Sequence, residues 1–211
     1  MATHFNNDEA CFATPMTIAL TSFITFNASL DTMTIWNDNG ASVTVTGVFR
    51  PQDVTMAAGG MSLYVLDNSD SNQRIALVDP LAGKITGQIP LPQAAYSSSA
   101  IVISPDGKFL YVTKGKPDLS AAPPAIVVLN LTTNKVAAEN SLPATVTPQG
   151  GITITSDGTF VYAPVADSVY VIHTMARKVA TTIPFPDSTA PLHVAMTPDG
   201  ASVYVARQRL C

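Results

Sequence analysis

The residues that could carry chemistry are few, and they stand far apart in the sequence. His193 is the strongest single candidate, because an imidazole can bind a metal ion or move protons near neutral pH. The competing interpretation is a hydrogen-bonded loop histidine. His173 falls beside a turn, and His4 lies near the N-terminus. Three dispersed histidines cannot build a zinc or copper centre without other ligands, so no metal site is predicted.

The carboxylates show no pairing that would serve acid and base catalysis. Glu9 and Glu139 are the only glutamates, and neither falls on a predicted inner strand. Asp106, Asp157 and Asp199 each precede a glycine, where a hairpin turn uses the carboxylate as a hydrogen-bond acceptor. The sequence also lacks the motifs G-x-S-x-G, G-x-G-x-x-G, H-E-x-x-H and C-x-x-C and a Walker loop. We therefore predict neither a catalytic residue nor a cofactor.

Composition and charge narrow the classes of partner. Only 12% of the residues are charged, the net charge is -4, and the 11 Lys and Arg residues are spread singly. Nucleic acid is therefore a poor partner, because no basic patch could neutralise a phosphate backbone. No apolar run approaches the ~18 residues that a membrane span needs. The apolar run 16–26 follows acidic rather than basic residues, so it is interpreted as a strand and not as a signal peptide.

Cysteine usage gives no disulfide framework. Cys11 and Cys211 lie near opposite ends of the chain. They are either two unrelated thiols or a pair that ties the ends together, and the sequence leaves both interpretations open.

The chain repeats itself at intervals of about 40 to 50 residues, which is the spacing of repeat architectures. Four glycine-containing turns mark the repeat, and in each a tyrosine follows the last glycine by four residues. Asp-Gly between apolar runs is a strong hairpin signal, because glycine accepts a positive φ without steric cost. The turns and their tyrosines are Gly59-Gly60 with Tyr64, Asp106-Gly107 with Tyr111, Asp157-Gly158 with Tyr162, and Asp199-Gly200 with Tyr204.

A second hairpin follows the first three of these turns, and Lys84, Lys135 and Lys178 occupy the same place in its turn. Two hairpins make a unit of four antiparallel strands. A weaker copy near the N-terminus lacks the Asp-Gly turn, so its first hairpin is expected to be short or irregular. The predicted organisation is a loose segment 1–14 and repeats over 15–211, in units 15–50, 51–97, 98–147, 148–190 and a partial unit 191–211.

Four-stranded units at this interval are typical of β-propeller blades. Strands such as 75–78, 125–129 and 169–172 are apolar without alternation, so both of their faces must be covered. Blades packed around an axis cover both faces, whereas a two-layer sandwich leaves one face wet and shows cleaner alternation. We predict an all-β propeller with about four to five blades, and a sandwich is the alternative.

The repeat resembles the YVTN-type propeller family of microbial surface-layer and lactonase-like proteins. The family pattern runs S-P-D-G, then Y-V-T-N, a V-I-D strand, T-x-x-N-K-V and an I-P ending. The resemblance covers about residues 31–207 and is more specific for fold than for function. The matching segments are 104–107 with 111–114, 197–200 with 204–207, 77–79, 132–136 and 183–184.

Two departures from the family pattern stand out. The asparagine that ends the tetrapeptide is missing from all four copies. The last unit ends after two strands, and the family commonly closes with seven blades, so we expect an incomplete, truncated ring, with a small propeller as the second interpretation. An open last blade would expose strand edges that pair with another chain.

The resemblance places ligands on the face formed by loops that enter the first strand and leave the second strand of each blade, near the axis. Each of these residues taken alone could equally be a solvated loop residue. The predicted binding residues are Arg50, Gln52, Asp53, Lys114, Gln149, His193 and Arg207.

Two functions follow from this picture. The first is a non-catalytic propeller module for protein or cell-surface interaction, because the inner strands carry almost no ionisable groups. The second, implied by the resemblance, is a lactonase-like hydrolase of the 6-phosphogluconolactonase type, acting on a sugar lactone. Expected partners are a protein or surface ligand, or a small carbohydrate-like ligand. The resemblance implies an extracellular or cell-surface location, although no convincing signal peptide is present.

Overall fold

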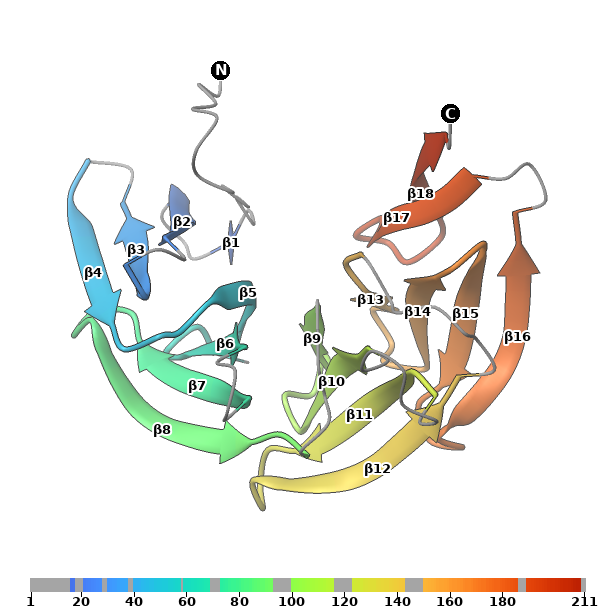
Figure 1. The fold of residues 1–211 in the computed structure, drawn as a ribbon, viewed down its shortest axis with the longest axis horizontal. Helices are drawn as coiled ribbons and strands as arrows, with labels where there is room; N and C mark the ends of the chain where they lie inside the picture. Colours follow the sequence, from blue (N-terminus) through green and yellow to red (C-terminus); the bar gives the residue numbers. More distant parts are fainter. Residues whose placement is uncertain are drawn as a thin grey trace. The chain divides into compact units, whose positions relative to one another are not determined.

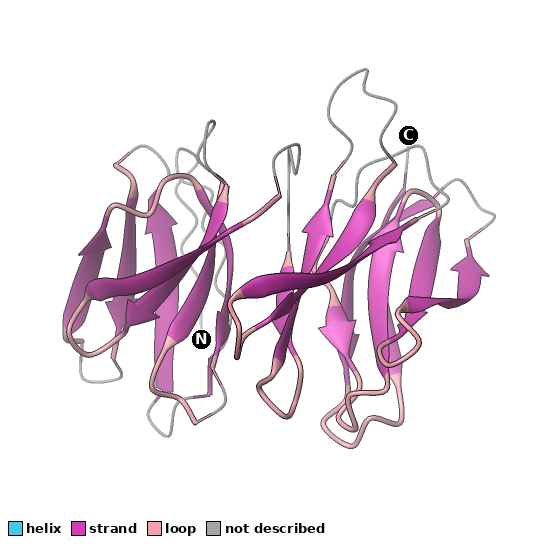
Figure 2. Cartoon of the chain, turned by 90° about the horizontal axis from the view of Figure 1, so that it is seen from below, coloured by secondary structure: helices cyan, strands magenta, loops and turns pink. Residues whose placement is uncertain are grey.

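The chain forms an all-β fold, and its strands group into separate antiparallel sheets (Figure 1). The computed structural model describes residues 16–17, 21–27, 30–37, 40–57, 59–68, 73–92, 100–115, 123–142, 150–185 and 189–209. Within these ranges every regular element is a strand, and no helix is present (Figure 2). The predicted all-β class is therefore confirmed.

The first compact unit, residues 1–90, contains two four-stranded sheets with their strands in sequence order. Ile24, Met33 and Val45 of the first sheet share one buried cluster with Val54 and Val65 of the second. The first sheet consists of β1 (Met16–Thr17), β2 (Thr21–Asn27), β3 (Thr32–Trp36) and β4 (Ser42–Thr46), and the second of β5 (Pro51–Met56), β6 (Leu63–Asp67), β7 (Arg74–Asp79) and β8 (Lys84–Pro90).

The second compact unit, residues 91–211, contains two more four-stranded sheets and a two-stranded one. Tyr111, Ile126 and Val128 share a buried cluster with Val161 and Ile172, so the two four-stranded sheets pack against each other. The strands are β9 (Ile101–Ile103), β10 (Phe109–Lys114), β11 (Ala125–Asn130), β12 (Lys135–Ser141), β13 (Thr153–Ile154), β14 (Phe160–Val165), β15 (Ser168–His173), β16 (Lys178–Pro184), β17 (Thr189–Met196) and β18 (Val203–Arg209).

The repeat predicted from the turns is present at the level of strand register. Each marker tyrosine pairs with the residue nine positions before it, so the four first hairpins have the same alignment. In the three later four-stranded sheets, the pairing of the third strand with the fourth shifts register at the same place in the repeat. The first-hairpin pairs are Thr55 with Tyr64, Val102 with Tyr111, Thr153 with Tyr162, and Ala195 with Tyr204.

The first-hairpin turns are built by one local hydrogen-bond pattern. The Ser104 hydroxyl donates to Asp106 Oδ1 at 2.6 Å, and the backbone N–H groups of Lys108 and Phe109 donate to Asp106 Oδ1 and Ser104 Oγ. The pattern recurs in the turns that begin at Thr155 and Thr197. The interpretation of these aspartates as turn acceptors is thus confirmed. Because Gly107 has a φ of 69°, glycine suits the last position of the turn.

The third strands are covered on both faces, as their sequences predict. Residues 125–129 of β11 and 168–172 of β15 are buried without interruption. The fourth strands β8 and β16 are largely exposed. Sheets with covered inner strands and exposed outer strands match propeller blades better than the layers of a sandwich.

Within the second unit, neighbouring sheets meet through the first strands and the first-hairpin turns. Gly151 and His193 form an isolated parallel bridge. A Cβ atom on Gly158 would lie 3.3 Å from Pro105 Cδ, so these two turns are in close contact. Gly200 meets Ser156 in the same way one sheet further on. The contact between turns therefore repeats with the sheets.

Candidate functional site

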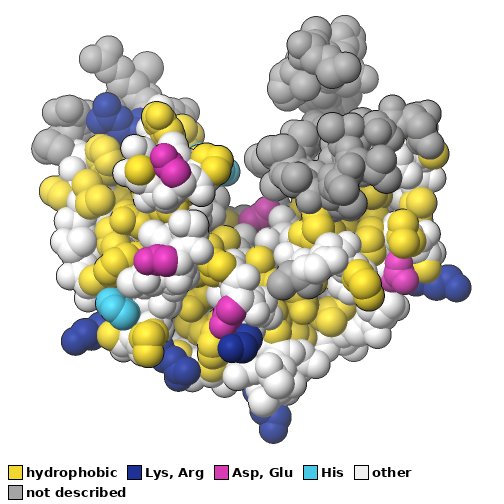
Figure 3. All heavy atoms as spheres, turned by 180° about the vertical axis from the view of Figure 1, so that it is seen from behind, with side chains coloured by type: hydrophobic (Ala, Val, Ile, Leu, Met, Phe, Trp, Pro, Cys, Tyr) yellow, Lys and Arg dark blue, Asp and Glu magenta, His cyan; other side chains and the backbone are white. Residues whose placement is uncertain are grey.

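Charged side chains are sparse among apolar and uncharged ones on the face that Figure 3 shows. The few polar groups with defined partners are therefore the candidates for a functional site. Within the described residues, no group of three or more His, Cys, Asp or Glu side chains is placed to hold a metal ion.

Three of the predicted binding residues lie in the first unit, at the start of β5. Arg50 is exposed and has a positive φ of 49°. Gln52 Nε2 donates to the Arg50 carbonyl oxygen at 3.2 Å. Asp53 Oδ1 accepts the backbone N–H of Val54 at 2.8 Å. Two of the three are strand residues rather than loop residues, because β5 begins at Pro51.

Lys114 differs from its expected place in a loop, because it is the buried last residue of β10. Its Nζ lies 2.6 Å from Glu139 Oε1 of β12, and the Lys114 side chain is only 9% exposed. Glu139, which was not singled out as a partner, gives this lysine a structural role. A ligand role for Lys114 stays a prediction.

His193 and Arg207 are both strand residues in the last hairpin. His193 is exposed, and its imidazole lies where a Cβ atom on Gly151 would be. Arg207 lies over the ring of Phe185, with its guanidinium carbon 5.3 Å from the ring centroid. Gln149, the remaining predicted residue, lies outside the described residues.

The pairing also relates His193 to Asp53. Each follows a pairing irregularity just after a proline, and each stands eleven positions before its marker tyrosine: Asp53 opposite Leu66 and His193 opposite Ala206. The same repeat position therefore carries a carboxylate in one unit and an imidazole in the other. A shared ligand for these residues stays a prediction.

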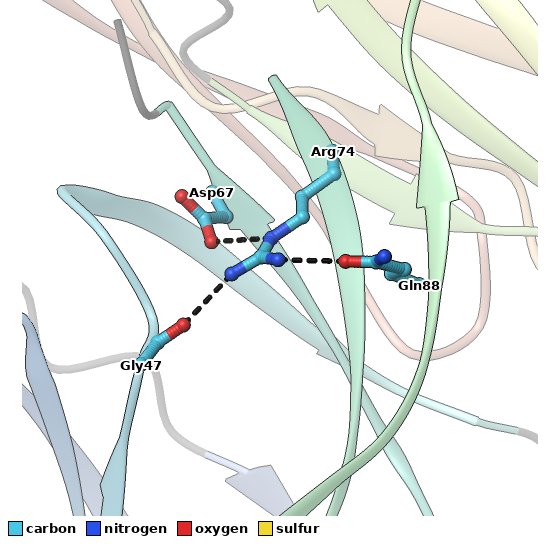
Figure 4. A network of polar contacts seen from close by, with 4 residues as sticks. All are labelled: Gly47, Asp67, Arg74 and Gln88. Atoms are coloured by element: carbon cyan, nitrogen blue, oxygen red, sulfur yellow. Dashed lines mark hydrogen bonds and ion pairs between the residues drawn. The ribbon is translucent and has the colours of Figure 1, made fainter. Parts of the chain in front are cut away.

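An ion-pair network lies at the end of β6, the second strand of the β5–β8 sheet in the first unit (Figure 4). Arg74 Nε lies 2.8 Å from Oδ2 of Asp67, whose side chain is fully buried. The same guanidinium donates to Gln88 Oε1 at 2.6 Å and to the Gly47 carbonyl oxygen at 2.8 Å. It also lies over the ring of Phe49, 5.7 Å from the centroid. Arg74 therefore joins β6, β7 and β8 to the segment that leaves β4.

Lys114 and Glu139 form the corresponding pair in the second unit, with the signs exchanged. Asp67 and Lys114 each follow the marker tyrosine of their sheet by three residues. Gln88 and Glu139 each stand opposite the equivalent residue of the third strand. This is the tetrapeptide position where the asparagine of the YVTN pattern is missing. At this position the two sheets use ion pairs to satisfy a buried polar group.

A cleft that the sequence analysis did not predict lies in the second unit, between the turn ends of the β9–β12 and β13–β16 sheets. Its volume is about 510 Å³, within the usual range of small-molecule sites. We call it the turn cleft. Its lining residues are Ser104, Pro105, Asp106, Phe109, Tyr111, Val128, Asp157, Gly158, Thr159, His173, Thr174, Met175 and Arg177.

Two carboxylates of the turn cleft stay ionised well below neutral pH. The Thr155 hydroxyl, followed by the Thr159 N–H, lowers the pKa of Asp157 from 3.8 to about 2. The Ser104 hydroxyl and the Lys108 N–H lower the pKa of Asp106. Hydrogen bonds to the charged form therefore move both groups away from the pKa that a general base needs at neutral pH.

The remaining polar groups of the cleft come from the second-hairpin turn. Thr174 Oγ1 donates to the Gly158 carbonyl oxygen at 2.7 Å. Arg177 Nη1 donates to the Ala137 carbonyl oxygen at 3.2 Å. Tyr111 is nearly buried, and burial, followed by the charge of Asp106, raises the pKa of its hydroxyl.

His173 keeps the turn-side role that the sequence indicates, and it also lines the cleft. Its Nδ1 accepts the Ala176 N–H at 3.3 Å, and its ring stands edge-on to Phe160 at 5.2 Å. The repeat alignment could have predicted that His173 lies near a neighbouring turn. It could not have predicted that a cleft opens between the two sheets there.

Comparisons with known proteins show the fold. No protein-family model matches the chain, and the search of curated proteins finds no match. Hydrazine synthase from Kuenenia stuttgartiensis matches in structure with a TM-score of 0.69 and 15% identity, over 89% of this chain and 68% of that one. A functionally unknown protein from Desulfotomaculum acetoxidans DSM 771 matches with a TM-score of 0.73 and 15% identity, over 93% of this chain and 62% of that one.

The sheets and these comparisons together define a β-propeller-like, all-β protein. Identities this low show the fold alone. The finer resemblance to the YVTN family stays a prediction, because it rests on the sequence motifs. Over the described part of the chain, no helix is long and apolar enough to cross a membrane.

Proposed function

We propose that the chain is a non-catalytic β-propeller module that binds a protein or a surface ligand, with its sheets arranged as blades around an axis. The proposal includes the YVTN-type character of the repeats. Its alternative is a hydrolase acting on a sugar lactone.

The observation that carries the proposal is the use of the described carboxylates inside the fold. Asp106, Asp157 and Asp199 accept hydrogen bonds within their own turns. Asp67 and Glu139 are held in ion pairs. Turn carboxylates with lowered pKa values, and carboxylates held by internal partners, suit a rigid scaffold better than proton transfer at neutral pH.

Exposed apolar side chains at the turns support a partner. Leu81 is 91% exposed and Met175 is 89% exposed. Both occupy the third position of a second-hairpin turn, two residues before the positive-φ position at Gly83 or Arg177. Long, flexible apolar side chains adapt to varied partner surfaces.

One experiment separates the module from the hydrolase. Purified protein is assayed for hydrolysis of glucono-δ-lactone, with His193→Ala as the comparison. We expect a rate equal to spontaneous hydrolysis for both proteins. Turnover by the wild-type chain that His193→Ala abolishes would refute the proposal and favour the hydrolase.

A second arm tests binding through the turns. Immobilised wild-type chain is compared with Leu81→Asp and Met175→Asp for capture of proteins from extracts of the source cells. Lys84→Asp and Lys178→Asp, at neighbouring turn positions, are the matched controls. We expect the apolar substitutions to lose a captured protein that the lysine substitutions retain. Equal loss in all four variants would indicate a general charge effect and contradict binding by the apolar turn residues.

A further inference from the structure

We propose that the turn cleft binds a neutral, polyhydroxylated ring, that is, a sugar residue, free or at the end of a glycan. The inference deepens the proposed binding function and rests on it. It uses a place in the fold different from the predicted binding face around His193.

Two contacts of cleft-lining residues join the two sheets. Pro105 packs against Gly158. Arg177 donates to the carbonyl oxygen of Ala137 in the neighbouring sheet. In the first compact unit the equivalent turn residue is Gly83, which lies directly against Val43 of the preceding sheet. Arg177 therefore reaches the preceding sheet with its long side chain, whereas Gly83 lies directly against a side chain of the preceding sheet.

The charges around the cleft balance. Asp106 and Asp157 supply two carboxylates whose pKa values lie below their ordinary range. Arg177 supplies one cation, and Lys108 Nζ lies 3.5 Å from Asp106 Oδ2 as a second. An anionic ligand would meet the carboxylates, and a cationic ligand would meet the guanidinium. A neutral ligand avoids both repulsions.

The cleft offers both donors and acceptors. Because His173 Nδ1 accepts the Ala176 N–H, the neutral imidazole carries its proton on Nε2, where it can donate. Asp157 Oδ1 holds the turn together, and the same carboxylate lines the cleft as an acceptor. Sugar hydroxyls donate and accept at once, so they suit such a mixed set.

The remaining wall is apolar and aromatic. Phe109, Tyr111 and Val128 line the cleft from the β9–β12 sheet. Tyr111 and Val128 are buried and form the floor of the cleft, whereas Phe109 is partly exposed and is the ring that a ligand can reach. Aromatic rings pack against the apolar face of an amphipathic ligand. The combination of such a wall with few polar groups is typical of small-molecule sites.

The test is a proton–nitrogen NMR titration of the full chain. The probes are glucose, galactose and N-acetylglucosamine as free sugars, and a linear glucose oligosaccharide as the glycan arm. We expect at least one probe to shift the signals of Tyr111, Thr159 and Thr174. If a free sugar binds more tightly than the oligosaccharide, the ligand is a free sugar. If the oligosaccharide binds more tightly, the ligand is a glycan.

Two substitutions in the cleft and one outside it complete the experiment. Arg177→Asn should weaken binding about tenfold, because it removes a charged hydrogen-bond donor. The fold should tolerate it, because Asn134 occupies the equivalent position with a φ of 53° against 51° for Arg177. Asp157→Asn keeps the turn acceptor and should also weaken binding. Lys178→Met, which removes a neighbouring charge that does not line the cleft, should leave affinity unchanged.

Three results would overturn the inference. They are the absence of cleft shifts with every sugar, an equal loss of affinity in Lys178→Met, and stronger shifts with sodium acetate or ethylammonium chloride than with any sugar. None of these results bears on the proposed binding module. That proposal is refuted only by lactone turnover that depends on His193, or by protein capture that does not depend on Leu81 and Met175.

Discussion

The ion pair of Asp67 and Arg74 gives the sharpest prediction about stability. Asp67 has no exposed side-chain surface, and its carboxylate lies 2.8 Å from Arg74 Nε. Arg74→Met would leave that carboxylate buried without its cation. Removing one partner of a buried pair costs about 3–5 kcal/mol of unfolding free energy. We therefore expect Arg74→Met to lower stability by an amount in this range.

Lys114→Met is the matched control, because Lys114 and Glu139 occupy the corresponding place in the other unit. Glu139 is 37% exposed, so water can solvate its carboxylate when the cation is removed. Pairs with a solvated partner contribute about 0–1 kcal/mol. The two substitutions should thus differ by about 2–5 kcal/mol, although each removes one cation from a short ion pair.

Urea unfolding followed by far-ultraviolet circular dichroism measures both variants. Fluorescence of Trp36, in the same compact unit as Arg74, follows that unit separately. Adding Asp67→Asn to Arg74→Met should recover part of the loss, because a neutral amide is easier to bury than a carboxylate whose arginine has been removed. Equal costs for the two single variants, or no recovery in the double variant, would refute the reasoning.

Two further predictions concern the turns. Gly158→Ala should lower the free energy of unfolding by about 1–2 kcal/mol because of its φ of +74°, and by a further amount because the added Cβ meets Pro105. Gly40→Ala, with nothing near its added Cβ, should lose only the first amount. Equal melting temperatures for the two variants would contradict this. The Asp157 carboxyl should titrate near pH 2 by NMR, so its contribution to stability is complete above pH 3.8 and is lost as the pH falls toward 2. Thr155→Val should return the pKa toward 3.8, and an unchanged value would exclude the hydroxyl as the cause.

The turns, and the positions of strand residues relative to them, were predictable from sequence, because their causes are local. A serine or threonine two residues before each Asp-Gly completes the turn through its own hydroxyl, as at Ser104 and Thr155. The tyrosine then falls at a fixed distance along the second strand. Uninterrupted apolar runs likewise indicated that strands such as β11 are covered on both faces.

The ion pairs and the turn cleft were not predictable, because they depend on register and packing. Lys114 and Glu139 are 25 residues apart in sequence, and β11 lies between their strands. The register irregularity between β11 and β12 sets which residue of β12 faces the lysine. The cleft depends on how closely two sheets approach, and Arg177 contacts the neighbouring sheet at Ala137, 40 residues away in sequence. Sequence reasoning found the polar residues but not their neighbours.

The equivalence of the hairpins is the claim on which the fold, the repeat and the proposed module all depend. Cross-strand NMR contacts in tyrosine-labelled protein test it most directly. The account predicts a contact of Tyr64 with Thr55, Tyr111 with Val102, and Tyr162 with Thr153, each at the same offset of nine residues. Tyrosines with different offsets, or without a partner on the preceding strand, would contradict it.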